Sequence, residues 1–257
     1  MYGLLVLLII VAISSIPVII VYIWFRAAKY QFTLIWFLLA MITGATAFFP
    51  ALILQDLINF TISSGGRLEL FYHVFIRIAF TEELSRLLML SIYFFLSERI
   101  AGSGTASSGA ASSGAASSGA ADNAVINISK QPVSWNKIKK GAAAGLAAGL
   151  GFAILESAVY AASDISVLLL RTVTAAPLHA ACGSRIGRAA MMIKTNPFQA
   201  LFHIFSATAI HGIYNFMISR PGFSSILAIL IAFSALFTAI TIILGGWSSD
   251  EAQQSNP

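Results

Sequence analysis

Charged residues are scarce in this sequence. Asp, Glu, Lys and Arg together make up 10% of its 257 residues, whereas hydrophobic residues make up 58%. The mean hydropathy is +0.86, and a soluble domain of this length cannot bury so much apolar surface. The composition excludes an ordinary soluble protein. It predicts an all-α fold, a polytopic bundle of transmembrane helices, and a multi-pass location in the cell membrane.

Cysteine is nearly absent from the sequence, and several common catalytic motifs are missing. Cys182 is the one cysteine, which excludes an internal disulfide. Residues 1–25 lack the basic start and the small-residue cleavage site of a signal peptide, and we interpret them as a retained first span. The chain has neither an HExxH motif nor paired aspartates of the presenilin type. No serine or cysteine has an obvious basic partner, so water is the predicted nucleophile of any hydrolytic site.

Long apolar runs predict about seven membrane spans, since about 20 such residues cross the hydrocarbon core of a bilayer. They cover residues 4–25, 33–55, 70–97, 139–162, 165–193, 198–218 and 223–245. With the N-terminus outside, ten of the fifteen Lys and Arg residues fall in cytoplasmic connections, and only Arg67 and Arg220 fall in outer ones. The positive-inside rule therefore favours an N-out, C-in orientation. Because the basic residues follow membrane topology, no nucleic-acid partner is predicted.

One connection differs in composition from the others. Residues 101–134, between the third and fourth spans, are rich in Ala, Ser and Gly, and residues 103–122 repeat the sequence ASSGA. Such a stretch buries too little surface to offset its conformational entropy. We predict a flexible cytoplasmic linker within a single membrane domain, residues 1–257.

The third span contains the sequence FTEELSRLLML, with two glutamates and an arginine in an otherwise apolar run. A charge near the bilayer centre costs about 3 kcal/mol or more, so it is rarely without a role. Arg86 follows Glu82 and Glu83 by four and three positions, and it reaches either along one helical face. We predict that Glu83 pairs at least partly with Arg86, which leaves Glu82 freer to act as a base. The reverse assignment stays open.

The fourth span combines a stripe of glycines with one acidic residue. Gly141, Gly145 and Gly149 recur every four residues, which predicts a close contact with another helix. Glu156 follows Gly149 by seven residues, or two turns, and therefore faces the same contact. No basic residue lies near it in its own helix, so we expect its partner on another span.

The fifth and sixth spans carry imidazoles. Arg171 and His179 lie on the fifth span, where Pro177 is expected to kink the helix. His211 and Asn215 lie four apart on the sixth span and share one face. Two further histidines are interpreted as structural or interfacial: His73 and His203.

The predicted depths of these groups agree. At about 1.5 Å per residue, Glu82, Glu156, His179 and His211 all fall in the outer half to the middle of the bilayer. One shared, hydrated site on four helices is the simplest explanation. Carboxylates and imidazoles together suit general acid–base activation of water. The Asn215 amide or an imidazole would stabilise the oxyanion that develops on a carbonyl.

The motifs in their order along the chain resemble a known family. The motifs are EExxR at Glu82–Arg86, FxxxE at Phe152–Glu156, the span with Arg171 and His179, and HxxxN at His211–Asn215. This arrangement resembles that of the PrsW family of intramembrane proteases. This family is related to the CAAX prenyl endopeptidases and the wider CPBP group. The resemblance covers residues 70–218.

The resemblance implies a glutamate-dependent endopeptidase that cuts a single-span membrane protein within the bilayer. Glu82 or Glu83, with His179 and His211, would activate water, and Asn215 with one imidazole would steady the oxyanion. PrsW proteins are best known for the first cut in a membrane-bound anti-sigma factor, on its extracytoplasmic side, and an outer-half site fits that role.

The resemblance also places Arg86 and Glu156 in the site, with Arg171 in a supporting role. Two departures matter: PrsW motifs often have Lys where Arg86 stands, and CAAX enzymes have FxxxH where this chain has Phe152 and Glu156. The second departure argues against prenyl-protein processing. We expect a metal-free mechanism without a cofactor, because no compact ligand motif sets a metal geometry. Zinc held by two His and a Glu stays as the alternative.

Two other classes of function stay open at this point. Intramembrane Glu, Arg and His are also typical of proton- or ion-coupled transporters, although no convincing inverted repeat is present. A non-catalytic scaffold of the same fold would use the polar residues only to hold its helices together.

Overall fold

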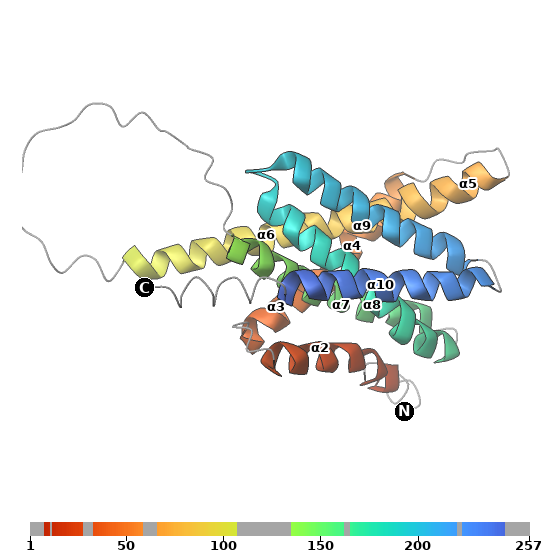
Figure 1. Cartoon of the computed structure of the whole chain (residues 1–257), viewed down its shortest axis with the longest axis horizontal. Helices are drawn as coiled ribbons and strands as arrows, with labels where there is room; N and C mark the ends of the chain where they lie inside the picture. The colour runs from red at the N-terminus through yellow and green to blue at the C-terminus, as the bar shows by residue number, and fades with distance from the viewer. Residues whose placement is uncertain are drawn as a thin grey trace, which may run out of the picture.

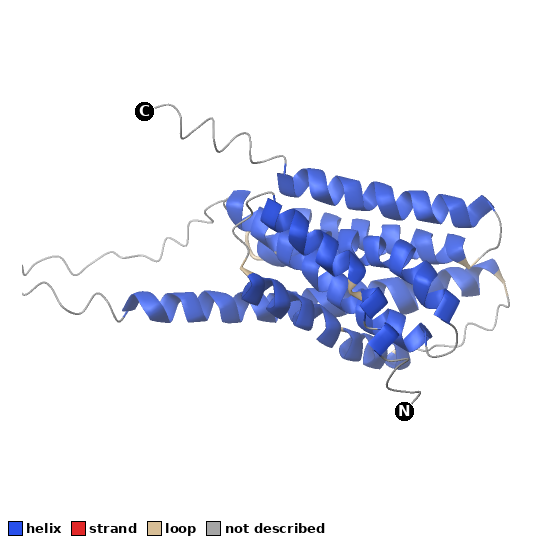
Figure 2. Cartoon of the chain, turned by 90° about the horizontal axis from the view of Figure 1, so that it is seen from below, coloured by secondary structure: helices blue, strands red, loops and turns tan. Residues whose placement is uncertain are grey.

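The computed structural model describes residues 8–10, 12–27, 33–58, 66–106, 135–161, 165–219 and 223–244. Every regular element in these ranges is a helix (Figures 1 and 2), which confirms the all-α prediction. The elements are α2 (Ile16–Ala27), α3 (Leu34–Thr46), α4 (Phe48–Leu57), α5 (Arg67–Phe71), the π-helix η1 (Tyr72–Phe80), α6 (Thr81–Ala106), α7 (Trp135–Ala161), α8 (Ile165–Met192), α9 (Pro197–Ile218) and α10 (Phe223–Leu244).

Five helices in the described part of the chain are long and apolar enough to cross a membrane. They are Leu8–Ala27, Leu34–Leu57, Asn136–Tyr160, Pro197–Ile218 and Ser224–Leu244. The other two predicted spans are also helical: one is the continuous run α5–η1–α6 and the other is α8. Both carry several ionisable side chains, which lower their hydropathy. The fold is thus a multi-pass membrane bundle, and the N-out orientation stays a prediction.

The predicted linker is described only at its start. Helix α6 continues to Ala106 and so includes residues 101–106 of the stretch expected to be flexible. Residues 107–134 lie outside the described residues. The composition of the linker therefore stays the only basis for the prediction of its flexibility.

Helices α7 and α8 form the centre of the bundle and approach each other closely. A Cβ on Gly145 would overlap the carbonyl oxygen of Gly183, and a Cβ on Gly149 would overlap that of His179. Only glycine permits this approach of one backbone to the other. The stripe therefore makes the predicted helix contact, and it brings the backbone of α7 against α8 at the level of His179.

A break divides the second span into α3 and α4 at Ala47. Pro50 lies in the first turn of α4, where it lacks an N–H and its ring conflicts with a straight continuation of α3. The Ser85 hydroxyl of α6 donates a short hydrogen bond to the Ala47 carbonyl, and Ala51 N–H donates to the same oxygen. These contacts fix the direction in which α4 leaves the break.

The segment that leads into the glutamates is a π-helix. Helix η1 ends at Phe80, directly before Thr81. The Thr81 hydroxyl donates a hydrogen bond of 2.6 Å to the Arg77 carbonyl. A Cβ on Gly212 of α9 would overlap the Phe75 ring, so η1 and α9 lie in close contact. π-Helical turns are rare and occur frequently at functional sites. Here the turn sets the rotation with which α6 presents its first residues.

Candidate active site

Glu83 and Arg86 form a fully buried ion pair on α6. Arg86 Nη2 lies 2.6 Å from Glu83 Oε1, and both side chains are buried completely. The guanidinium carbon of Arg86 also lies 4.5 Å from the centre of the Phe152 ring, a cation–π contact. Glu83 Oε1 further contacts His211 Nδ1 at 2.8 Å. The predicted pairing of Glu83 with Arg86 is confirmed, and this pair holds one nitrogen of the His211 ring.

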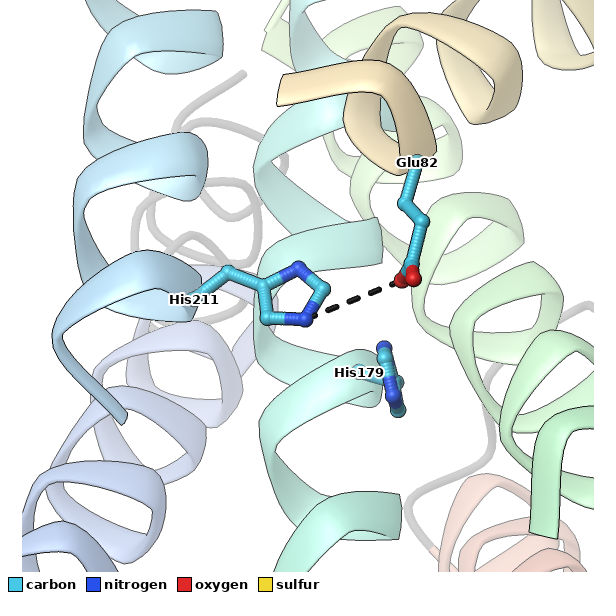
Figure 3. Close-up of side chains that lie close together, drawn as sticks. All are labelled: Glu82, His179 and His211. Atoms are coloured by element: carbon cyan, nitrogen blue, oxygen red, sulfur yellow. Dashed lines mark ion pairs between the residues drawn. The ribbon is translucent and has the colours of Figure 1, made fainter. Parts of the chain in front are cut away.

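Glu82 lies beside this pair but is held less tightly. Its Oε2 atom lies 3.7 Å from Arg86 Nη2 and 3.7 Å from His211 Nε2, the contact drawn in Figure 3. Oε2 is buried and accepts no hydrogen bond from the described residues. Its Oε1 atom accepts a long hydrogen bond of 3.4 Å from Gln55 Nε2. Glu82 thus has one carboxylate oxygen, Oε2, that lies near both His211 and Arg86 and accepts no hydrogen bond from the described residues.

Glu156 of α7 finds its partners on α8, as expected. Its Oε2 atom lies 2.6 Å from Arg171 Nη2 and 2.6 Å from His179 Nε2. The guanidinium carbon of Arg171 lies 4.2 Å from the centre of the Tyr160 ring. Arg171 is the most exposed of this group, with 19% of its side chain accessible, against 10% for Glu156 and 1% for His179. Glu156 and Arg171 therefore line the more accessible side of the cluster and hold the His179 ring from that side.

The two imidazoles meet between these pairs. The ring centres of His179 and His211 lie 5.0 Å apart with an edge-to-face angle of 86°. Figure 3 shows both rings and the Glu82 carboxylate around one small space. Side chains from α6, α7, α8 and α9 therefore converge in one cluster, buried except for the partly exposed Arg171: Glu82, Glu83, Arg86, Glu156, Arg171, His179 and His211.

Asn215 and two histidines do not join this hydrogen-bonded cluster. The backbone carbonyl of Asn215 accepts a hydrogen bond from Ser219 N–H at 3.2 Å, and its half-buried side chain makes no hydrogen bond to the cluster within the described ranges. His73 instead lies 3.5 Å from Arg77 Nη1, and His203 contacts the ring of Phe202.

One polar neighbour of the site was missed by the sequence analysis. Gln55 lies near the end of α4, in the apolar run FFPALILQDL. An amide in such a run is unusual, and that was the available signal. Its proximity to Glu82 depends on the break at Ala47, which no periodicity reveals.

The donor set fits a divalent metal such as zinc. One oxygen or nitrogen each of Glu82, His179 and His211 lies within 4.8 Å of the others. Each ring is held by a carboxylate at one nitrogen: Glu83 contacts His211 Nδ1, and Glu156 contacts His179 Nε2. The opposite nitrogen of His179, Nδ1, has no hydrogen-bond partner among the described residues. Carboxylates behind metal-binding imidazoles are the usual second shell of zinc sites.

These observations define a membrane-embedded helical bundle with a buried glutamate–histidine centre, an arrangement suited to hydrolysis. The family model described as "PrsW family intramembrane metalloprotease" matches residues 33–243. The chain therefore belongs to the PrsW family and is an intramembrane protease. No curated protein and no solved structure shows a significant match to it.

The family match confirms the resemblance seen in the motifs and extends it beyond residues 70–218 at both ends. It favours a protease over the transporter and over the scaffold. The family's description as metalloproteases agrees with the zinc alternative and not with the metal-free mechanism that we expected from the sequence. The absence of a compact ligand motif does not exclude a metal, because the candidate ligands Glu82, His179 and His211 come from three different helices.

Proposed function

We propose that this protease cleaves a membrane-anchored protein with a water molecule activated between Glu82, His179 and His211. The observation that carries the proposal is the buried Oε2 atom of Glu82, which accepts no hydrogen bond from the described residues and faces His211 Nε2 at 3.7 Å. A water molecule at this point would be within reach of a carboxylate base and two imidazoles. Hydrogen bonds in substrate-free sites are often long and shorten when the reaction complex forms.

The other cluster residues have supporting roles in this proposal. The Glu83–Arg86 pair orients His211 through Nδ1, and the Glu156–Arg171 pair orients His179 through Nε2. With both rings fixed, one imidazole takes part in proton transfer and the other, with the Asn215 amide, stabilises the developing oxyanion. Removal of a supporting residue should therefore reduce the rate without abolishing substrate binding.

A metal would be held by the same three residues, Glu82, His179 and His211. When bound, it would supply an acidified water and polarise the substrate carbonyl. The side chains keep their orienting roles in either case, since the carboxylates behind the imidazoles are the second shell that such a site requires.

The proposed substrate is a single-span membrane protein, and an anti-sigma factor cut at a first site on its extracytoplasmic side is the particular candidate. The membership in the PrsW family supports it, and the position of the cluster in the outer half of the bilayer, which stays a prediction from the sequence, is consistent with it. We propose that a substrate backbone approaches from the side of Glu156 and Arg171, whose slight exposure supports this direction.

Purified protein in proteoliposomes, supplied with a set of single-span peptides, tests the proposal. We expect cleavage by the wild-type protein and a loss of at least about 100-fold for Glu82→Gln, because general acid–base groups contribute about 10²–10⁴-fold. Glu98→Gln is the matched control: Glu98 lies on the same helix in an exposed pair with Lys137, and its loss should leave the rate unchanged. A chelator added in parallel separates metal-dependent from metal-free cleavage. Cleavage that survives in Glu82→Gln would refute the role given to Glu82.

A further inference from the structure

Gln55 of α4 is a polar side chain next to the site with no role so far. It is half-buried, and its Nε2 atom lies 3.4 Å from Oε1 of Glu82. The neighbouring residues Leu52, Ile53, Asp56 and Leu57 are exposed. Leu54 and Gln55 are the half-buried residues of this turn, and the Gln55 amide is directed at the carboxylate that we propose as the base.

The backbone of Gln55 is fixed by contacts that do not involve its own side chain. Arg77 Nε of η1 donates a hydrogen bond of 3.1 Å to the Gln55 carbonyl. At the other end of α4, the Ser85 hydroxyl donates to the Ala47 carbonyl at the break. The helix is thus attached to the η1–α6 segment on both sides of Glu82. A substitution of the Gln55 side chain leaves both attachments in place.

The two oxygens of Glu82 consequently differ. Oε1 accepts the Gln55 amide, whereas Oε2 accepts no hydrogen bond from the described residues and lies 3.7 Å from His211 Nε2. A carboxylate with neither oxygen held can rotate about its last torsion angle, which is broad. A donor on Oε1 restricts that rotation and keeps Oε2 toward the imidazoles.

We propose that Gln55 is a positioning residue: its amide holds Oε1 of Glu82 so that Oε2 faces the space between His179 and His211. The inference rests on the proposed function, because it assigns Oε2 as the reacting oxygen. It also accounts for the break in the second span. Without that break, α4 would not bring an amide against Glu82.

The test uses the full-length protein in proteoliposomes with a single-span peptide that the wild type cuts. Gln55→Met keeps the size of the side chain and removes the N–H donors, whereas Gln55→Asn keeps the amide on a chain one methylene shorter. We expect kcat to fall about 10- to 100-fold in Gln55→Met, the range typical for groups that orient a reacting residue, with KM within about twofold. Gln55→Asn should recover part of kcat. Asp56→Asn, a change of the exposed neighbour on α4, is the matched control and should leave both constants unchanged.

Infrared difference spectroscopy supplies a readout that does not depend on cleavage. The carboxylate band of Glu82, assigned by its absence in Glu82→Gln, should shift in Gln55→Met and stay in place in Asp56→Asn. If the wild type cuts the peptide and Gln55→Met keeps its kcat, the inference is wrong while the proposed function stands. If the wild type cuts no peptide, the proposed function fails. In that case the inference about Gln55 is judged by the infrared spectrum alone, and it is wrong if the Glu82 band has the same position in Gln55→Met as in the wild type. The inference is also wrong if kcat falls in Gln55→Met, Gln55→Asn recovers none of it, and the Glu82 band does not shift. Gln55 would then have a merely structural role.

Discussion

Replacement of Arg86 by methionine probes how strongly the charges of the site stabilise the fold. Arg86 is completely buried, and it contacts Glu83 Oε1 at 2.6 Å, the Glu82 carbonyl at 3.4 Å and the Phe152 ring at 4.5 Å. Methionine fills a similar volume but leaves the Glu83 carboxylate, which is itself fully buried, with only His211 as a partner. Removal of one member of a buried ion pair costs about 3–5 kcal/mol, because the other charge stays uncompensated in a low-dielectric interior.

The measurement is equilibrium unfolding in mixed detergent micelles, followed by far-ultraviolet circular dichroism. Arg99→Met is the matched control: Arg99 lies on the same helix, is exposed, and contacts the Phe95 ring at 5.0 Å. Its loss should cost about 1 kcal/mol or less. The double variant Glu83→Gln/Arg86→Met should be more stable than Arg86→Met alone, because it also removes the orphaned charge.

Two results would refute this reasoning. One is an Arg86→Met protein within about 1 kcal/mol of Arg99→Met, which would mean that Glu83 does not need the guanidinium. The other is a double variant as unstable as Arg86→Met, which would trace the cost to packing against Phe152 and not to charge. Arg86→Lys keeps the charge but loses the planar donor set, and it should fall between the wild type and Arg86→Met.

Two further predictions concern the supports of His179. Gly149→Ala places a methyl group on the His179 carbonyl oxygen. We expect a loss of about 1–3 kcal/mol in the free energy of unfolding together with reduced cleavage. A variant of wild-type stability would contradict the close approach of α7 and α8. Glu156→Gln weakens the contacts to Arg171 and to His179 Nε2, and we expect kcat to fall about 10- to 100-fold with KM little changed. A change confined to KM would instead make Glu156 a substrate-binding group.

The sequence predicted the helices and the members of the cluster better than it predicted their connections. The positions of Glu82, Glu156, His179 and His211 on separate apolar runs were sufficient to expect one shared site, because an unpaired charge in lipid is too costly to be scattered. The Glu83–Arg86 pair followed from helical spacing, since both residues lie on one helix. The glycine stripe likewise predicted a close neighbour for α7, although its identity as α8 required the structure.

What sequence reasoning missed depends on geometry between helices. Gln55 approaches Glu82 only because Pro50 and Ala47 interrupt the second span, and the resulting direction of α4 is not encoded in any local pattern. The π-helix before Glu82 could not be predicted either, because its wider turn has no distinct residue preference. The argument for a metal-free mechanism has a related weakness: a search for compact ligand motifs overlooks candidate ligands that tertiary contacts bring together, such as Glu82, His179 and His211.

The charges of the cluster do not balance, and this imbalance concerns Glu82. Glu83 has Arg86 at 2.6 Å and Glu156 has Arg171 at 2.6 Å, whereas Glu82 has no partner nearer than 3.7 Å among its ion pairs with described residues. A carboxylate buried without a close counter-charge is unfavourable, so this excess charge lowers the stability of the folded protein unless a bound cation offsets it.

The two cases predict opposite effects of Glu82→Gln on stability. Without a metal, the neutral amide relieves the excess charge, and the variant should unfold at a higher denaturant concentration than the wild type. With a metal, the variant loses a ligand that stabilises the folded state by mass action, and it should unfold at a lower concentration. Chelator-treated wild-type protein would then lose stability as well, whereas it would be unaffected in the first case. Both cases would be contradicted if Glu82→Gln had the same stability as the wild type with and without chelator. The Glu82 carboxylate would then neither lower nor raise the free energy of unfolding.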